Sequence, residues 1–306
     1  MTLQPSRTGR DRAATDAAHV LSFDVEEYFQ VEAAAHAIGR DQWTTFAGRA
    51  GPCVDLILDL LDRHRASATF FVLGWVAQHD PAMVRRIADA GHEIASHGMT
   101  HAMLDRLTHE EFRRELDDSR KLLEDLSGRP IAGYRAPTFS ITHETAWALD
   151  ALCDAGFDYD SSVFPVHHDR YGVPGAPQVA HRAVAPSGGS ILELPPLTLR
   201  LLGQNVPVGG GGYLRLLPVR LVARCLRSWG RRGRIGMLYL HPWELDPGQP
   251  PLPLGRLRRW RHRLGLSTTH AKLQWLLQRF RFTSVRQSYD ALQAAAQSSF
   301  AYGATD

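Results

Sequence analysis

The chain of 306 residues has few cysteines, no long apolar run and little net charge. Its three cysteines, Cys53, Cys153 and Cys225, are far apart and form no C-x-x-C pair, which argues against a disulfide framework and against a thiolate zinc site. No segment approaches the ~20 consecutive apolar residues of a membrane span. The polar stretch 1–18 lacks the apolar core of a secretory signal. We therefore expect reduced thiols and a cytoplasmic protein.

The formal net charge of +3 is too small to suggest nucleic-acid binding, but the arginines are unevenly distributed. They are dense at 220–234 and again at 256–263. A solvated helical face is the simpler interpretation. The alternative is a contact surface for an anionic polymer or for anionic lipid at the inner membrane face.

Short apolar segments alternate with longer helical patterns along most of the chain. Pro81 fits the first turn of one helix, and Thr108 with Glu111 forms a capping box at the start of another. This alternation predicts a βα-repeat barrel or a doubly wound sheet with about seven strands. Strands are expected at 20–23, 68–72, 93–95, 131–134, 157–159, 191–194 and 235–240, and helices at 54–64, 81–90, 108–126 and 142–155.

Two histidines follow the third expected strand. His97 and His101 stand four residues apart, a spacing that places both side chains on one face of a helical turn, where they can bind one metal ion. The chain has 15 histidines, so the pair alone does not decide for metal binding. His97 directly follows a strand, which is where barrel enzymes place their active sites.

Three carboxylates, Asp24, Glu26 and Glu27, follow the first expected strand. Strand alternation turns Asp24 and Glu26 to the same side, so that one could ligate a metal while the other stays free as a base. Whether Glu26 or Glu27 is the ligand stays open. One carboxylate and two histidines with an open position are typical of a catalytic zinc site. The alternative is a polar strand end that leads into a loop.

Three further segments place polar residues after expected strands. Arg135 could fix and neutralise a carboxylate, although an arginine by itself is more often on the surface. Asp160 could equally be a helix cap or a turn residue. His241, locked by Pro242, is well placed as a general acid, and a structural histidine is the alternative.

Taken in order, these five segments resemble the NodB-type polysaccharide deacetylases of carbohydrate esterase family 4. The resemblance covers residues 20–241, and the order of the five motifs is far more specific than any one of them. Some stretches are closer still to the subfamily associated with exosortase and exopolysaccharide gene systems, which carries an extra C-terminal region. These stretches are SFDVEEYF at 22–29, PVGGGGYLR at 207–215, HPWELDP at 241–247 and RFRFT at 279–283.

The resemblance implies a distorted (β/α) barrel of about seven strands with a C-terminal extension. It also implies metal-dependent hydrolysis of N-acetyl groups in a polysaccharide or oligosaccharide that contains N-acetylhexosamine, within exopolysaccharide biosynthesis. The divalent metal would be Zn²⁺, with Co²⁺, Ni²⁺, Mn²⁺ or Fe²⁺ as alternatives. The expected organisation is a disordered tail at 1–17, a NodB-like catalytic domain at 18–245, an extension packed on it at 246–292 and a flexible tail at 293–306.

The resemblance also implies roles for individual residues. Asp24 matches the general base, and Arg135 matches the residue that pairs with it. His241 matches the general acid, with Asp160 orienting it. The backbone N–H of Thr138 matches an oxyanion donor.

Metal binding in the family corresponds here to Glu26, His97 and His101. Most members have two adjacent aspartates in the first motif, but Val25 stands at the second of these positions, so Glu26 would be the ligand. The fourth motif has a serine where members usually have a tryptophan, which affects the sugar-binding wall more than the chemistry. Residues beside the motifs are expected to contact the substrate: Tyr134, Pro137 and Trp243.

Two other functions stay open at this stage. The same site could serve an amidohydrolase that acts on a small cyclic or linear amide, or the chain could be a non-catalytic glycan-binding module. Intact Asp24, Arg135 and His241 argue against a mere binder, which has no need of all three. The resemblance implies an acetylated glycan as the partner and allows a peripheral contact with the polysaccharide machinery, and the oligomeric state is left open.

Overall fold

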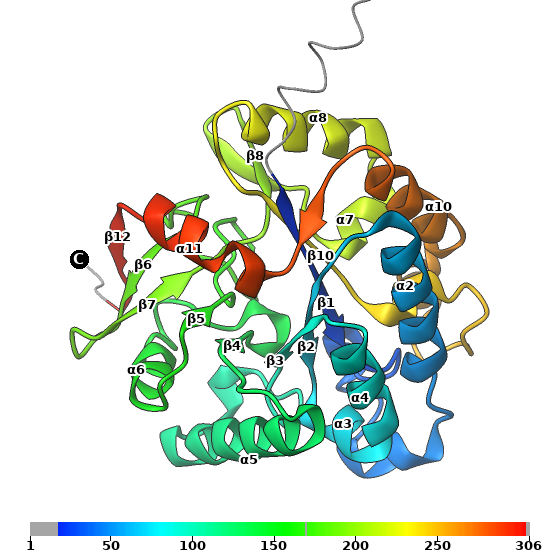
Figure 1. The fold of residues 1–306 in the computed structure, drawn as a ribbon. Coiled ribbons are helices and arrows are strands. Elements are labelled where there is room, and N and C mark those ends of the chain that lie inside the picture. The colour runs from blue at the N-terminus through cyan, green and yellow to red at the C-terminus, as the bar shows by residue number, and fades with distance from the viewer. Residues whose placement is uncertain (1–17, 169, 304–306) are drawn as a thin grey trace, which may run out of the picture.

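The computed structural model describes residues 18–168 and 170–303, so the tail expected at 1–17 lies outside the described residues (Figure 1). At its centre, parallel strands are hydrogen-bonded in the order β10-β1-β2-β3-β4-β5-β7. These are the seven strands that the alternation predicts. Their bounds are β1 His19–Val25, β2 Thr69–Val72, β3 Glu93–Ser96, β4 Gly133–Tyr134, β5 Tyr159–Asp160, β7 Ser190–Glu193 and β10 Met237–Leu240.

Helices connect these strands, and the predicted end signals are present. Asp80 caps the helix that opens with Pro81, and the Thr108–Glu111 capping box starts the longest one. Gly128 ends that helix in the left-handed conformation with φ of 66°, which glycine adopts readily. The connecting helices are α2 Ala50–His64, α3 Gly74–His79, α4 Pro81–Asp89, α5 His109–Ser127, α6 Trp147–Asp154, α7 Gly211–Leu216 and α8 Val219–Gly230.

Two apolar clusters lie on the two sides of the strands. Leu21 and Phe23 of β1 belong to the large cluster that includes the buried faces of the helices, whereas Val20 belongs to a smaller cluster with Phe71 and Met237. Because side chains alternate along a strand, Val20, Ser22 and Asp24 share the second side. On this side of β1, the apolar Val20 is thus followed by polar residues toward the carboxyl end of the strand.

The C-terminal segment belongs to the sheet. Strand β11 (Phe282–Thr283) pairs with the start of β1, and β12 (Ser299–Ala301) pairs with β6 (His181–Val184), which is antiparallel to β7. Figure 1 shows this orange-to-red segment running from β1 to the opposite edge. The remaining elements are β8 Thr198–Leu201, β9 Gln204–Pro207, α9 Arg256–Arg263, α10 Leu266–Leu277 and α11 Val285–Ala295.

One expectation about this end of the chain is wrong. The segment 246–292 packs against earlier elements, and its strand β11 also adds to the sheet. The described part of 293–306 is not a flexible tail, because it contains β12 and the buried Tyr302, whose hydroxyl contacts His181. Backbone pairing and a buried aromatic ring fix this segment, although its sequence shows no clear strand or helix pattern. Among the described helices, none combines the length and the apolar character needed to cross a membrane.

Candidate active site

The candidate site lies where neighbouring parallel strands end. Asp24 and Glu26 come at the end of β1, His97 follows β3, Arg135 follows β4, and His241 follows β10. The carboxyl ends of parallel strands meet at one edge of the sheet, which is where barrel enzymes hold their active sites. The structure thus brings together residues that are up to about two hundred positions apart in the chain.

Glu26, His97 and His101 form a group that could hold a metal ion. Each offers one ligand atom, and these atoms lie within 4.8 Å of one another. All three residues are buried, and His101 Nε2 lies 2.5 Å from Glu26 Oε2. One carboxylate oxygen and two imidazole nitrogens suit a borderline divalent metal such as Zn²⁺, with positions left for water and substrate. The donor set therefore fits the expected metal.

The two histidines reach this position without a helix. Residues 97–103 form a loop in which Gly98 and His101 have positive φ values of 74° and 54°. The expectation that both fall on one helical turn is therefore wrong, although their side chains do converge. His97 Nδ1–H donates to the carbonyl oxygen of Arg135 at 2.8 Å, so Nε2 is the ring nitrogen that could bind a metal ion. Burial lowers the pKa of His97 to about 4, so its ring is neutral, as a metal ligand requires.

Glu26 is the carboxylate of this group, and Glu27 has another task. The Glu27 side chain accepts hydrogen bonds from the backbone N–H groups of Arg49 and Ala50, at the start of α2. Burial raises the pKa of Glu26, but the neighbouring His101, His241 and His97 outweigh this effect and leave it at about 2. Alternation along β1 is thus confirmed at its end, because Glu26 faces the histidines and Glu27 does not.

Asp24 is held by a fully buried arginine. Arg135 has no exposed surface, and its Nη1 lies 2.5 Å from Asp24 Oδ1 and 3.0 Å from Ser22 Oγ. Its Nε and Nη2 donate to the carbonyl and hydroxyl oxygens of Ser161, and its guanidinium lies 3.9 Å from the centre of the Phe71 ring. A charge this deep needs such partners, and they fix its position. The expected pairing of Asp24 with Arg135 is therefore present.

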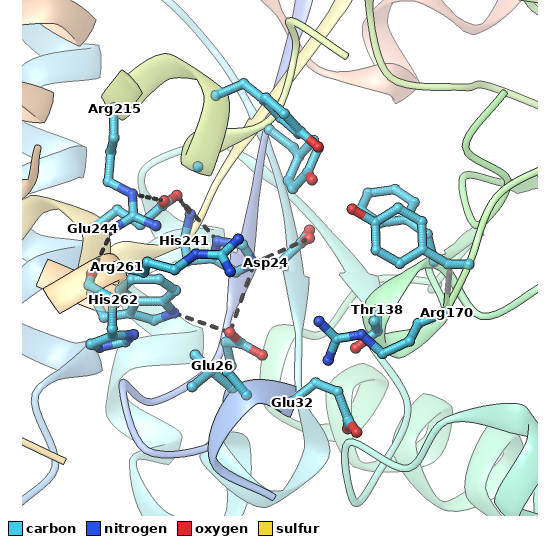
Figure 2. A pocket seen from close by; sticks show the side chains of 18 of the residues that line it. Asp24, Glu26, Glu32, Thr138, Arg170, Arg215, His241, Glu244, Arg261 and His262 are labelled. Carbon is cyan, nitrogen blue, oxygen red and sulfur yellow. Dashed lines mark hydrogen bonds and ion pairs between the residues drawn. The ribbon is translucent and has the colours of Figure 1, made fainter. Parts of the chain in front are cut away.

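His241 faces Asp24 and Glu26 from the end of β10. Its Nε2 lies 3.9 Å from Asp24 Oδ2 and 3.7 Å from Glu26 Oε1. Its Nδ1–H donates to Glu244 Oε2 at 3.1 Å, and the same oxygen accepts the His241 backbone N–H at 3.0 Å (Figure 2). Burial lowers the pKa of His241, but the carboxylates of Glu26, Glu244 and Asp24 raise it to about 9. The ring can therefore carry a proton toward the site.

Glu244 occupies the position that we assigned to Asp160, and that assignment is wrong. Asp160 accepts a hydrogen bond from Ser162 Oγ and lies beside Glu193 in the register of β5 and β7, where burial raises its pKa to about 6. The reason is the strand order, because β5 and β10 are separated by β1 to β4. Glu244 follows His241 by three residues in the 3-10 turn Pro242–Leu245, which turns its carboxylate back to the ring.

The four-glycine stretch leaves room for this carboxylate. A Cβ on Gly211 would lie 1.5 Å from Glu244 Oε2, and one on Gly210 would lie 2.6 Å from the Tyr239 hydroxyl. The helix that follows, α7, carries Arg215, whose Nε lies 2.8 Å from Glu244 Oε1, although the N–H is not aligned for a hydrogen bond. Glu244 is thus enclosed by Gly211, Arg215 and His241. Sequence reasoning noted the glycines but missed both Glu244 and Arg215.

The site opens into a cavity of about 1000 Å³. Thr138 and Trp243 line it, as expected for residues near the substrate. Thr138 has a positive φ of 58°, a strained conformation that is common at functional sites. The Trp243 indole N–H donates to Glu26 Oε1 at 3.0 Å, so this ring also fixes the candidate ligand.

Two of the expected substrate contacts are wrong. Tyr134 and Pro137 are buried and do not line the cavity. The Tyr134 ring packs edge-on against Phe112 and Phe157, because its strand directs it into the helix-covered core. The C-terminal half supplies much of the cavity wall instead. Its contributions include Tyr171, Tyr213, Leu216, Arg258, Trp260, Arg261 and Leu264.

Parts of the chain are similar to known protein families and to curated proteins. Residues 41–159 match the polysaccharide deacetylase family, and residues 161–290 match a domain of unknown function, DUF3473. A chitooligosaccharide deacetylase from Rhizobium leguminosarum bv. trifolii is 40% identical over 129 residues, which cover 42% of this chain and 56% of that protein. The peptidoglycan deacetylase-like protein FGM2 of Gibberella zeae is 36% identical over 39% of this chain and 34% of its own length. The chain thus spans only part of the length of these curated relatives.

Solved structures share the fold along nearly the whole chain. A Mycobacterium smegmatis protein assigned to the polysaccharide deacetylases matches with a TM-score of 0.60 at 21% identity, over 95% of both chains. Puue allantoinase matches with a TM-score of 0.57 at 16% identity, over 94% of this chain and 91% of its own. At these identities the likeness shows the fold alone. It agrees with the predicted distorted (β/α) barrel.

Proposed function

We propose that this chain, which belongs to the polysaccharide deacetylase family, is a metal-dependent N-deacetylase of a glycan that contains N-acetylhexosamine. One observation carries the proposal: the donor group Glu26, His97 and His101 lies beside a paired Asp24–Arg135 and an oriented His241. The motifs shared with the exopolysaccharide-associated subfamily support a role in exopolysaccharide biosynthesis. The nitrogen and oxygen donors support Zn²⁺ as the metal.

A divalent metal bound by Glu26, His97 and His101 would polarise the amide carbonyl and lower the pKa of a bound water. Asp24 then accepts the proton of the attacking water, and the guanidinium of Arg135 holds the Asp24 carboxylate in position. The backbone N–H of Thr138, on the cavity wall, stabilises the oxyanion, an interaction often worth ~3 kcal/mol.

His241 completes the reaction as the general acid. Its Nδ1–H is engaged by Glu244, so Nε2 is the nitrogen that delivers a proton to the departing amine. Glu244 fixes the tautomer and the ring orientation, and Arg215 holds the carboxylate of Glu244 in turn. The amine leaves as a neutral group, and the C–N bond breaks without expelling an amide anion.

The cavity favours a glycan over a small amide as the substrate. Its volume of about 1000 Å³ stands at the upper end of the ~300–1,000 Å³ typical of small-molecule sites. Aromatic side chains on its wall, such as Tyr213 and Trp260, offer flat apolar surfaces for sugar rings. A single cyclic or linear amide would leave most of this wall uncovered.

Acetate release tests the proposal. The full chain, loaded in turn with Zn²⁺, Co²⁺, Ni²⁺, Mn²⁺ or Fe²⁺, is incubated with N-acetylated oligosaccharides, O-acetylated oligosaccharides and a cyclic amide. We expect release from the N-acetylated glycans and loss of bound metal and nearly all activity in His97→Ala and His101→Ala, with the fold retained. Hydrolysis of the cyclic amide alone would refute the glycan substrate. A variant that keeps stoichiometric metal at wild-type affinity would remove that histidine from the ligand set.

A further inference from the structure

Each described carboxylate on the cavity wall is engaged by neighbouring groups. Asp24 pairs with Arg135, and Glu244 pairs with Arg215. Glu32 pairs with Arg106, outside the cavity wall. The fourth, Glu26, belongs to the candidate metal group with His97 and His101. Within residues 18–168 and 170–303, the cavity wall therefore keeps no carboxylate for a further cation.

Three lining arginines are left over by this pairing. Arg170, Arg258 and Arg261 line the cavity, and none has an ion pair with a carboxylate in the described part of the chain. Arg258 contacts the ring of His36, which is also on the wall. Figure 2 shows Arg261 and Arg170 pointing into the pocket from opposite sides, one beside His262 and the other beside Thr138. The excess charge thus lies on both walls of the cavity.

Helix α9 separates its arginines by task. Arg259 and Arg263 donate to backbone carbonyl oxygens of the preceding loop, at Leu254 and at Pro247 and Gln249. Arg258 and Arg261, three residues apart and hence on one helical face, line the cavity instead. The arginine-dense segment 256–263 is therefore more than a solvated face. Part of it fixes a loop, and part of it faces the candidate active site.

We propose that the cavity binds a glycan bearing an anionic substituent, a carboxylate or a phosphate, and that Arg261 and Arg170 recognise this group. The inference rests on the proposed function, whose substrate it makes more specific. A guanidinium matches two oxygens of a carboxylate or phosphate with parallel hydrogen bonds. Trp260, 58% exposed and next to Arg261, presents a flat surface for the sugar that carries the anion. Among the described residues, a neutral glycan would leave these guanidinium groups without an anionic partner.

The anion has two sources, and matched substrates separate them. One is a uronate within the glycan, and the other is a phosphate group at its reducing end, as on a lipid-linked intermediate. The metal-loaded full chain is given three N-acetylated oligosaccharides of equal length: a neutral one, one with a uronate residue, and one with a short-chain alkyl pyrophosphate at its reducing end. A lower KM for one anionic glycan than for the neutral one is expected, and it identifies the source.

Charge-neutralising variants supply the second arm. Arg261→Gln and Arg170→Gln should each raise KM for the preferred anionic glycan about 5- to 10-fold, the low end for a charge-assisted hydrogen bond because both side chains are exposed. KM for the neutral glycan should stay within about twofold. Arg256→Gln is the control, because Arg256 belongs to the same helix but does not line the cavity.

Equilibrium binding of the same three glycans keeps the two proposals distinguishable. If the neutral and anionic glycans bind and react alike, and both variants match Arg256→Gln, the anionic subsite is overturned while the deacetylase stands. If no glycan releases acetate but the anionic one still binds in a manner that depends on Arg261, the deacetylase is overturned while the subsite stands.

Discussion

Replacing Glu244 by glutamine removes the charge behind His241 with little change in volume. In the native protein the Glu244 carboxylate accepts from the His241 ring at 3.1 Å and from the His241 backbone N–H at 3.0 Å, and its other oxygen lies 2.8 Å from Arg215 Nε. A glutamine has a single acceptor oxygen for these partners. Either Arg215 meets an N–H₂ group or His241 loses the acceptor that fixes its tautomer.

The expected loss follows from the general-acid role proposed for His241. General acid catalysis contributes about 10²- to 10⁴-fold, and a misoriented ring forfeits part of this. We expect kcat for the N-acetylated glycan to fall by roughly 10- to 100-fold, with KM changed by less than about threefold. One buried group left without its partner costs about 1–3 kcal/mol, so the variant should be less stable but folded.

The assay compares two acetyl substrates that differ in the leaving group. Hydrolysis of an N-acetylated glycan needs a proton on the departing nitrogen. The leaving group of an activated aryl acetate is a phenolate, which needs no proton to depart. Glu244→Gln should therefore reduce the amide rate far more than the ester rate. Glu32→Gln is the matched control, because Glu32 lines the same cavity but pairs with Arg106. Equal losses on both substrates, with normal metal content and fold, would refute the role of Glu244 in proton delivery.

Three further predictions follow from the same contacts. Asp24→Asn should keep nearly normal metal content while activity falls at least ~10²-fold. Glu26→Gln should weaken metal binding and recover part of its activity at high metal concentration. Metal analysis and rate measurements test both variants, and the opposite pattern would mean that the two residues have exchanged roles. Glu27→Ala should lower the free energy of unfolding by ~0.5–2 kcal/mol through loss of its hydrogen bonds at the start of α2, and unchanged urea unfolding would contradict this. Burial lowers the pKa of His19 and His181 to about 4, whereas a histidine in the unfolded chain has a pKa of ~6.5. Below pH ~6.5 the unfolded chain therefore binds more protons, and the free energy of unfolding should fall between pH ~6.5 and ~4 by at most ~1.4 kcal/mol per pH unit for each histidine. Urea unfolding midpoints at pH 7 and pH 5 test this.

Local patterns in the sequence were enough to predict the parallel strands and several helix ends. An apolar run between two helical patterns carries its own signal, and so do Pro81 and the Thr108–Glu111 capping box. The pairing of Asp24 with Arg135 was expected from the family resemblance, whereas the residues alone left Arg135 open as a surface arginine. The strands and the helix ends need only local patterns of apolar residues and end signals.

Contacts that depend on strand order or on loop shape could not be predicted in this way. The pairing of His241 with Asp160 required β5 to lie near β10, which no local pattern specifies. The helical turn assigned to His97 and His101 failed because Gly98 and His101 adopt positive φ values, which end any helix. Glu244 did leave a signal, since a glutamate three residues after a histidine that ends a strand can turn back onto its ring.

The boundary between the two matched regions, at residues 159 and 161, does not separate two structural units. Strands β7 and β10 of the second region complete the parallel sheet, and β11 pairs with the start of β1. Helix α11 then reaches the amino ends of the first region's strands, where Val285 and Arg286 donate backbone hydrogen bonds to Thr69 and Glu93. The donor group Glu26, His97 and His101 precedes the boundary, whereas His241, Glu244 and the arginines of the cavity follow it. The proposed chemistry and the proposed choice of substrate therefore require both regions to fold together.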